Sequence, residues 1–376
     1  MSTLGGAVVE VLPAWMVARV LVGGCLVVAH LAVHSVRPGN PTALQRVHDG
    51  LLGWDAGWYR SIADHGYSVA GHQSLRFFPL YPILGRTLGH VPGIGSGVAL
   101  IVVANMASLL AMAGLLLLVR HDRVDIRGGD PGLERRSVWL LALAPSAFAL
   151  VLAYADAVLL LCVVVVFLGI RTERWWWAVA AGLAAGAARP VGVLLVVPVA
   201  VELWSHRQRW TGARQWTRGI AALGAPLVGV AAYLAWVGHV FGNAWLPFTV
   251  QQQSGHRGRL AAPFEAMWHD AIDALHGHHL GSALHIPWVA VCVALAIVAW
   301  RRLPRSYAVF CVAVLVVSLS SSNLDSFERY ALGAFPLVVA ASTFTSRRPV
   351  ELAILVTSAI AMVGYATLSF LGSVVP

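Results

Sequence analysis

Apolar segments long enough to cross a lipid bilayer recur along this chain from one end to the other. Hydrophobic residues make up 58% of its 376 residues and charged residues only 11%, whereas about 25% charged residues are usual in a soluble domain. A segment surrounded by lipid must satisfy its backbone hydrogen bonds internally, so such segments are helices. The sequence therefore predicts an all-α, polytopic integral membrane protein. Since no polar stretch exceeds the one at 35–97, we expect a single membrane domain over residues 1–376.

Hydropathy and loop signals together predict about eleven transmembrane helices. Two closely spaced pairs, at 137–170 and 175–204, leave few residues for each helix: about 15 residues span roughly 22 Å, less than a ~30 Å hydrocarbon core. Such helices either line a cavity at half length or extend into the membrane interface. The expected spans are 15–36, 98–119, 137–153, 157–170, 175–188, 191–204, 219–240, 285–300, 306–321, 330–344 and 350–372.

The arginines assign sides to these spans. All 26 basic residues are arginine, and sixteen of them fall in alternate connections. Since basic residues favour cytoplasmic loops, this predicts a cytoplasmic N-terminus and an external C-terminus. Lysine-free composition with abundant Ala, Val and Gly suggests a GC-rich bacterial genome, and hence a bacterial plasma membrane. The arginine-rich connections are 120–136, 171–174, 205–218, 301–305 and 347–348.

The opposite, external side receives two long loops, at 35–97 and 241–284, and three short connections. This side carries nine acidic residues and nine arginines. Such balanced charge near helix ends suits a polar cavity that binds an anionic ligand. A solvated loop surface would give similar counts. The positions of individual residues distinguish a cavity from such a surface better than the counts do.

The most informative of these residues is Asp55, which lies among aromatic residues in Trp54-Asp55-Ala56-Gly57-Trp58-Tyr59. A carboxylate in an apolar membrane interface is costly to keep charged and is usually retained for chemistry or pairing. The spacing of Trp54, Trp58 and Ile62, joined by Tyr59, predicts an amphipathic helix over 54–67 lying in the interface. The alternative is an anchor helix in which Asp55 only complements the helix dipole. The following Arg76–Pro82 segment contains two prolines, so we expect it to be irregular.

This motif resembles the first luminal loop of the PIG-V family, mannosyltransferases of the glycosyltransferase-C superfamily. The resemblance continues through Phe77-Phe78-Pro79-Leu80-Tyr81-Pro82, Pro145-Ser146-Ala147-Phe148, Arg189-Pro190, Gln251–Gln253 and Arg329-Tyr330. Two departures stand out. Ala155-Asp156 replaces a frequent Ser-Glu, and Gly255-His256-Arg257 replaces an aromatic-Arg pair.

The resemblance implies a glycosyltransferase (EC 2.4) that moves a hexose, expected to be mannose, from a polyprenyl-phosphate donor to an external acceptor hydroxyl. Asp55 is the expected catalytic base, with a pKa raised by its apolar surroundings. Arg329 is the first candidate for the donor phosphate and Arg189 the second, because a guanidinium matches phosphate oxygens. The further substrate-binding candidates are Asp156, Arg60, Arg76, Tyr59 and Gln252.

Three alternative interpretations are also compatible with the sequence. The first is a divalent metal held by His and Asp residues of 269–285, but no established ligand motif is present and we expect no cofactor. The second is a transporter or flippase of a lipid-linked or anionic substrate, which the absence of an evident inverted repeat disfavours. The third is a non-catalytic partner of another glycosyltransferase. The metal-ligand candidates are His269, Asp270, Asp273, His276, His278, His279 and His285.

Overall fold

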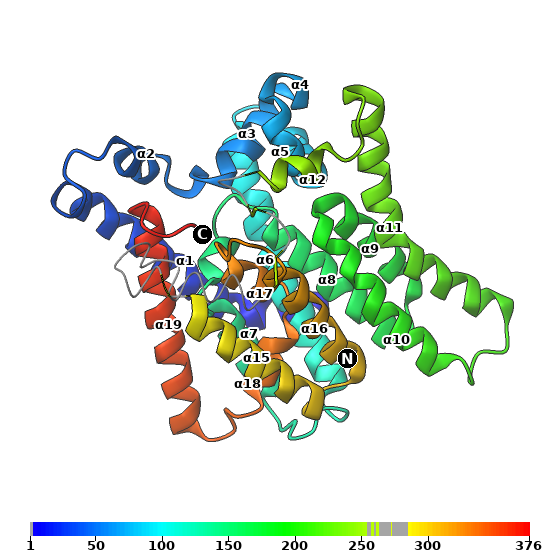
Figure 1. The fold of residues 1–376 in the computed structure, drawn as a ribbon. Coiled ribbons are helices and arrows are strands. Elements are labelled where there is room, and N and C mark those ends of the chain that lie inside the picture. The colour runs from blue at the N-terminus through cyan, green and yellow to red at the C-terminus, as the bar shows by residue number, and fades with distance from the viewer. Residues whose placement is uncertain (1–2, 254–256, 259–260, 263–271, 273–284) are drawn as a thin grey trace.

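Five long apolar helices form the frame of the molecule. A computed structural model describes residues 3–253, 257–258, 261–262, 272 and 285–376, and helices are the regular elements in this part of the chain, with no β-strand. These five are long and apolar enough to cross a membrane, which confirms a multi-pass membrane protein. They are α1 (Leu4–Val36), α6 (Ser96–Asp122), α11 (Ala213–Phe241), α15 (His285–Arg302) and α19 (Arg348–Phe370) (Figure 1).

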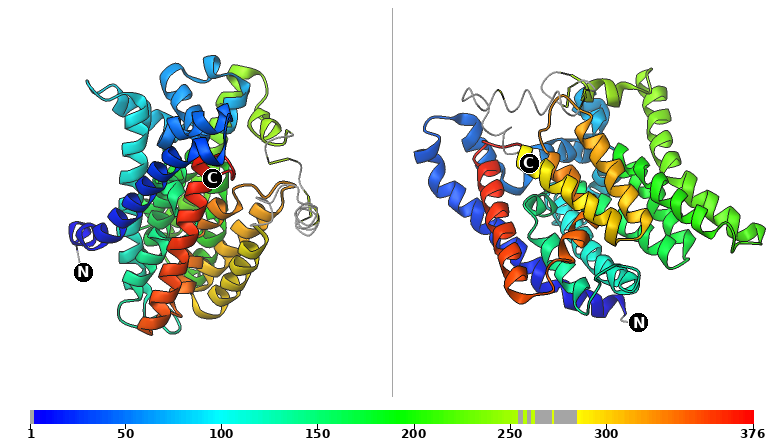
Figure 2. Two further views of the ribbon diagram at one scale, coloured as in Figure 1. Left: turned by 90° about the vertical axis from the view of Figure 1, so that its left-hand side faces the viewer. Right: turned by 60° about the horizontal axis from the view of Figure 1, so that its bottom comes forward.

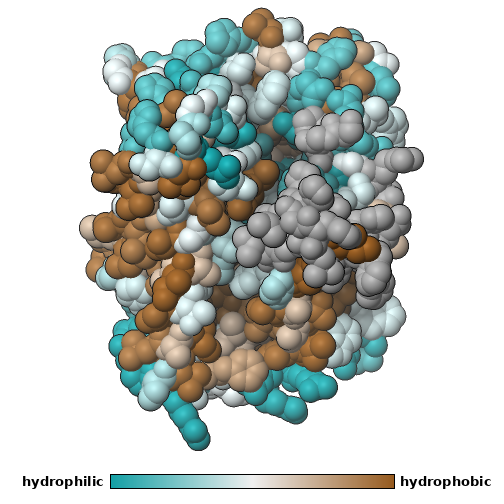
Figure 3. Space-filling model, turned by 60° about the vertical axis from the view of Figure 1, so that its left-hand side comes forward, coloured by the Kyte–Doolittle hydropathy of each residue, from teal (hydrophilic) through white to brown (hydrophobic). Residues whose placement is uncertain are grey.

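Shorter helices fill the space between these five. Two views of the ribbon show them packed beside the long helices (Figure 2). On the face shown in Figure 3, hydrophobic side chains gather in a band between hydrophilic ends, as expected for a membrane-embedded surface. The shorter helices are α7 (Leu133–Ala142), α8 (Asp156–Arg171), α9 (Trp175–Ala188), α10 (Val196–His206), α16 (Arg305–Leu319), α17 (Phe327–Leu332) and α18 (Pro336–Ser342).

Two expected spans are not continuous helices. The segment 137–153 ends its helix at Ala142 and continues through a bend to the 3₁₀ helix η3 (Ala147–Leu150). The segment 330–344 is divided between α17 and α18. Pro145 disfavours helical geometry in the residue before it. Phe335, before Pro336, keeps α-helical backbone angles, but Pro336 has no N–H to continue the hydrogen bonds of α17 and instead begins α18. The number of eleven spans therefore stays a prediction.

The short pair at 175–204 brings a turn into the interior. Helix α9 ends at Ala188, Arg189 is extended, and the 3₁₀ helix η4 (Pro190–Leu195) leads into α10. α9 packs closely on α11 at Gly186 and Gly229. A Cβ at either glycine would collide with a backbone carbonyl oxygen of the other helix, so this approach needs glycine. This close approach fixes the turn that carries Arg189.

The segment 35–97 forms a helical cap at one end of the molecule, together with α12 (Leu246–Gln251) (Figure 1). The expected amphipathic helix is α3, and Gly66, with φ of 79°, ends it. Its apolar stripe, however, packs on protein: the Tyr59 ring lies 4.9 Å from those of Phe77 and Tyr81. The other cap elements are α2 (Pro41–Asp49), η1 (Gly50–Leu52), α3 (Asp55–His65), α4 (Tyr67–Ala70), η2 (His72–Arg76) and α5 (Leu80–Gly89).

The prolines of the cap differ from expectation in one respect. Phe77 and Phe78 are non-helical, but Pro82 lies in the first turn of α5. A proline is tolerated there because the first-turn N–H groups of a helix have no partner within the helix. The irregular segment is therefore shorter than Arg76–Pro82.

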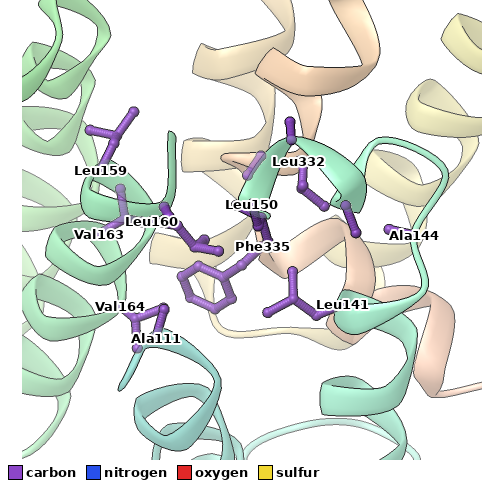
Figure 4. Close-up of a cluster of buried hydrophobic side chains, with 14 of the residues drawn as sticks. Ala111, Leu141, Ala144, Leu150, Leu159, Leu160, Val163, Val164, Leu332 and Phe335 are labelled. Carbon is purple, nitrogen blue, oxygen red and sulfur yellow. The ribbon is translucent and has the colours of Figure 1, made fainter. Parts of the chain in front are cut away.

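A second group of charges closes the opposite end. Arg171 contacts Asp122 at 2.8 Å and Glu202 at 3.2 Å, and the Tyr307 hydroxyl donates to Asp122 at 2.7 Å. These contacts join α6, α8, α10 and α16. Between the two ends lies the hydrophobic core, part of which surrounds Phe335 (Figure 4). Arg171, one of the arginines expected in the cytoplasm, thus lies away from the cap.

Candidate active site

A cavity of about 580 Å³ lies between the cap and the helical body. Residues distant in sequence meet there, from α3, η2, η4, α12, α17 and the segment before α17. Four of its lining residues are arginines and two are aspartates, so the cavity is rich in positive charge. Its charged and polar lining residues are Asp55, Tyr59, Arg76, Arg189, Gln251, Arg257, Asn323, Asp325, Ser326, Arg329 and Tyr330.

Asp55 and Arg329 face each other directly. The Nη1 atom of Arg329 donates to Oδ2 of Asp55 at 2.8 Å, across 274 positions of sequence. The Arg329 side chain is 6% exposed, while the Asp55 side chain keeps 30% exposure toward the cavity. The carboxylate is thus held by one cation and still open to a ligand.

The two short helices that carry this pair begin at strained residues. Trp54, immediately before α3, has φ of 57°, and Ser326, immediately before α17, has φ of 65°. Non-glycine residues in this region are uncommon and concentrate at functional sites. Trp54 is held by a hydrogen bond from its indole N–H to the Ser369 carbonyl at 3.1 Å and by the Arg46 guanidinium, 3.0 Å from its ring centroid.

A second ion pair adjoins the first. Arg189 donates to Oδ1 of Asp156, at the start of α8, and Arg329 lies 4.0 Å from Oδ2 of the same carboxylate. Asp55, Arg329, Asp156 and Arg189 therefore form a continuous row of alternating charge. Both arginines line the cavity.

Three guanidiniums surround the ring of Tyr330. Their Cζ atoms lie 4.3 Å (Arg257), 5.0 Å (Arg189) and 5.5 Å (Arg329) from the ring centroid. Arg257 and Tyr330 were not among the sequence candidates. A signal for Arg257 was present in the departure at Gly255-His256-Arg257, and Tyr330 adjoins Arg329 in the sequence.

The pKa shift expected for Asp55 has the wrong direction. Burial raises the pKa of this carboxyl, but the charge and hydrogen bond of Arg329 oppose that effect, with further contributions from Arg76 and Arg189. The net result is a pKa below the ordinary value. The apolar residues next to Asp55 in the sequence do not indicate that Arg329, Arg76 and Arg189 lie near its carboxylate in the fold.

The remaining sequence candidates separate into two groups. Tyr59 and Arg76 line the cavity, and the Arg76 guanidinium lies 4.8 Å from the centroid of the Phe77 ring. Gln252 is exposed and outside the lining, whereas Gln251 lines the cavity, because successive helical residues point about 100° apart. Arg60 is 56% exposed and lies 3.7 Å from Asp64.

Most of the metal-ligand candidates, His269 to His279, lie outside the described residues. His285 is described, and its ring contacts Glu328 and Asp325. Within the part of the chain that the structure covers, no group of three His, Cys, Asp or Glu side chains is arranged to hold a metal ion.

The fold and the cavity define a helical membrane protein with an arginine-rich pocket at one end, arranged around paired carboxylates. The chain belongs to glycosyltransferase family 87, whose model matches residues 79–322. The match includes Asp156, Arg189 and Arg257 and leaves Asp55 and Arg329 outside. Membership indicates transferase activity. The family model does not test the resemblance to PIG-V.

Two solved structures match most of this chain, and the first of them is similar in fold. ArnT from Cupriavidus metallidurans bound to undecaprenyl phosphate has a TM-score of 0.52 at 17% identity, over 81% of this chain and 58% of that chain. The oligosaccharyltransferase AglB from Archaeoglobus fulgidus, in complex with an inhibitory peptide and a dolichol-phosphate, gives 0.45 at 12% identity, over 93% and 55%. This chain thus spans little more than half of either protein. Comparison with curated proteins gave no match.

Proposed function

We propose that this protein transfers a hexose from a polyprenyl-phosphate donor to an acceptor hydroxyl outside the cytoplasm. The observation that carries the proposal is the Asp55–Arg329 pair at the edge of a cavity with four arginines. A base and a cluster of phosphate-binding cations are the two requirements of this reaction. The ArnT structure, bound to undecaprenyl phosphate, supports a lipid-phosphate donor on this fold.

The arginines around Tyr330 are proposed to bind the donor phosphate. The Nε atoms of Arg329 and Arg257 are buried and find no hydrogen-bond acceptor among the described residues. A buried donor without an acceptor is costly, and a phosphate oxygen would satisfy it. Arg189, next to Asp156, would add a third cation and stabilise the phosphate as it leaves.

Asp55 is proposed to act as the base. When the donor phosphate occupies Arg329, the carboxylate loses part of its ion pair and can accept a hydrogen bond from the acceptor hydroxyl. That oxygen then attacks the anomeric carbon, the bond from this carbon to the phosphate oxygen breaks, and the proton passes to Asp55. Attack on the face opposite the phosphate inverts the anomeric configuration. Tyr59, Arg76 and Gln251 line the same cavity and would orient the sugars. Asp156 would contribute through its ion pair with Arg189.

The finer parts of the proposal rest on the sequence. Mannose as the sugar follows from the resemblance to PIG-V, and an external site in a bacterial plasma membrane follows from the arginine distribution. We also propose one catalytic domain over residues 1–376. The reaction as written needs no metal. Family membership favours this enzyme over a transporter or a non-catalytic partner.

The pH dependence of the reaction tests the role of Asp55. Because arginines lower its pKa, the carboxylate of the free enzyme stays ionised below the pH at which an ordinary aspartate is protonated. The acid limb of kcat/KM should therefore lie below that pH. Bound phosphate neutralises part of the field of Arg329, raises the pKa of Asp55, and should move the acid limb of kcat to higher pH. Initial rates across pH measure both limbs, and coincident limbs would contradict the mechanism.

A further inference from the structure

His285 lies between two carboxylates, those of Glu328 and Asp325, in the segment that leads to Arg329. It is the first residue of α15 and is buried, with 2% of its surface exposed. Its Nδ1 atom lies 2.7 Å and 2.9 Å from the two carboxylate oxygens of Glu328. Its Nε2 atom lies 3.7 Å from Oδ1 of Asp325. Both ring nitrogens therefore face negative charge.

This arrangement favours a charged imidazole, because one ring nitrogen bonds to Glu328 and the other lies within ion-pair distance of Asp325. Only the imidazolium has a proton on both nitrogens, whereas the neutral ring can donate to one carboxylate. Glu328 is also buried, and besides His285 it accepts a hydrogen bond from the Tyr365 hydroxyl at 3.3 Å. A buried carboxylate without a cation is strongly destabilising. His285 is thus the cation that balances Glu328.

The two carboxylates bracket the segment that reaches the proposed phosphate site. Asp325 lines the cavity and accepts a hydrogen bond from the Asn323 side chain at 3.0 Å. Glu328 immediately precedes Arg329 in α17. Between the two carboxylates lies the strained residue Ser326. Whatever holds both Asp325 and Glu328 also fixes the direction in which Arg329 points.

We propose that His285 is a positioning residue for the donor site, holding the segment 325–329 so that Arg329 faces the cavity. This inference rests on the proposed function, because it assigns the positioned cation to a lipid phosphate. His285 itself does not line the cavity. It acts through two charge contacts, with Glu328 in α17 and with Asp325 in the segment before α17.

The experiment measures binding of undecaprenyl phosphate to the purified full-length protein in detergent, with undecaprenol as the ligand lacking phosphate. The variants are His285→Gln and the double variant His285→Gln/Glu328→Gln. The double variant buries no unbalanced charge, so we expect it to fold with a Tm near that of wild type even if His285→Gln does not. It still lacks the contact with Asp325, and we expect its affinity for the lipid phosphate to fall about tenfold.

The control is His206→Gln. His206 is also largely buried and lies 3.5 Å from Glu173, in a different part of the fold. This variant should bind like wild type. A folded double variant with unchanged affinity would show that His285 only supports folding and would overturn the inference. Wild-type protein that does not distinguish undecaprenyl phosphate from undecaprenol would overturn the proposed function itself, and the inference with it.

Discussion

Protein carrying Asp55→Asn is expected to fold normally and to transfer sugar about a thousandfold more slowly than wild type. The amide still accepts the hydrogen bond from Arg329 but cannot take a proton from the acceptor, and a positioned base contributes typically about 10²–10⁴-fold. The effect should appear in kcat, because the amide preserves the shape of the cavity. Initial rates at saturating donor and acceptor measure it.

The matched control for Asp55 is Asp64→Asn in the same helix. Asp64 pairs with Arg60 at the surface and does not line the cavity. Its substitution should leave both the rate and the Tm close to those of wild type. A kcat for Asp55→Asn within about threefold of wild type would exclude this carboxylate as the base.

Arg329→Gln is expected to reduce use of the donor by about a hundredfold or more in kcat/KM and to destabilise the protein. Removal of this cation leaves Asp55 and Asp156 without their shared partner, and breaking a buried pair in this way typically costs about 3–5 kcal/mol. Donor kinetics and thermal unfolding measure the two effects separately.

Arg329→Lys separates charge from geometry. Lysine retains the positive charge between the two carboxylates but lacks the planar fork that binds two phosphate oxygens. We therefore expect a Tm near that of wild type and a donor KM raised about tenfold. Arg60→Gln, on the exposed side of α3, is the control and should leave donor kinetics unchanged. If a folded Arg329→Lys protein had wild-type donor kinetics, the guanidinium of Arg329 would not be needed to bind the phosphate.

Hydropathy predicts the parts of this fold that depend on local sequence. The five long helices follow from continuous apolar runs, and the helix at Asp55 follows from the spacing of its aromatic residues. The interruptions at 143–146 and 333–335 were not predicted. A window of apolar residues has the same mean hydropathy whether the chain is helical or bent, and the bend depends on what packs against it.

In the candidate site too, the sequence predicts individual residues, whereas their contacts depend on the fold. Asp55, Tyr59, Arg76, Arg189 and Arg329 were selected from the resemblance together with their charged or aromatic character, and all of them line one cavity. Their partners are a property of the fold. The sign of the pKa shift at Asp55 is set by arginines that are distant in sequence. The choice of Gln251 over Gln252 depends on the rotation of a helix about its axis.

The proposed reaction takes its sugar from a polyprenyl-phosphate sugar and not from a nucleotide sugar. The most direct test supplies purified protein in liposomes with radiolabelled polyprenyl-phosphate mannose or, separately, with nucleotide-linked mannose, and with extracted bacterial membrane glycans and lipids as acceptors. We expect labelled product from the lipid-linked donor with wild-type protein and none with Asp55→Asn. Product from the nucleotide-linked donor alone, or equal product from wild type and Asp55→Asn, would contradict the proposed reaction.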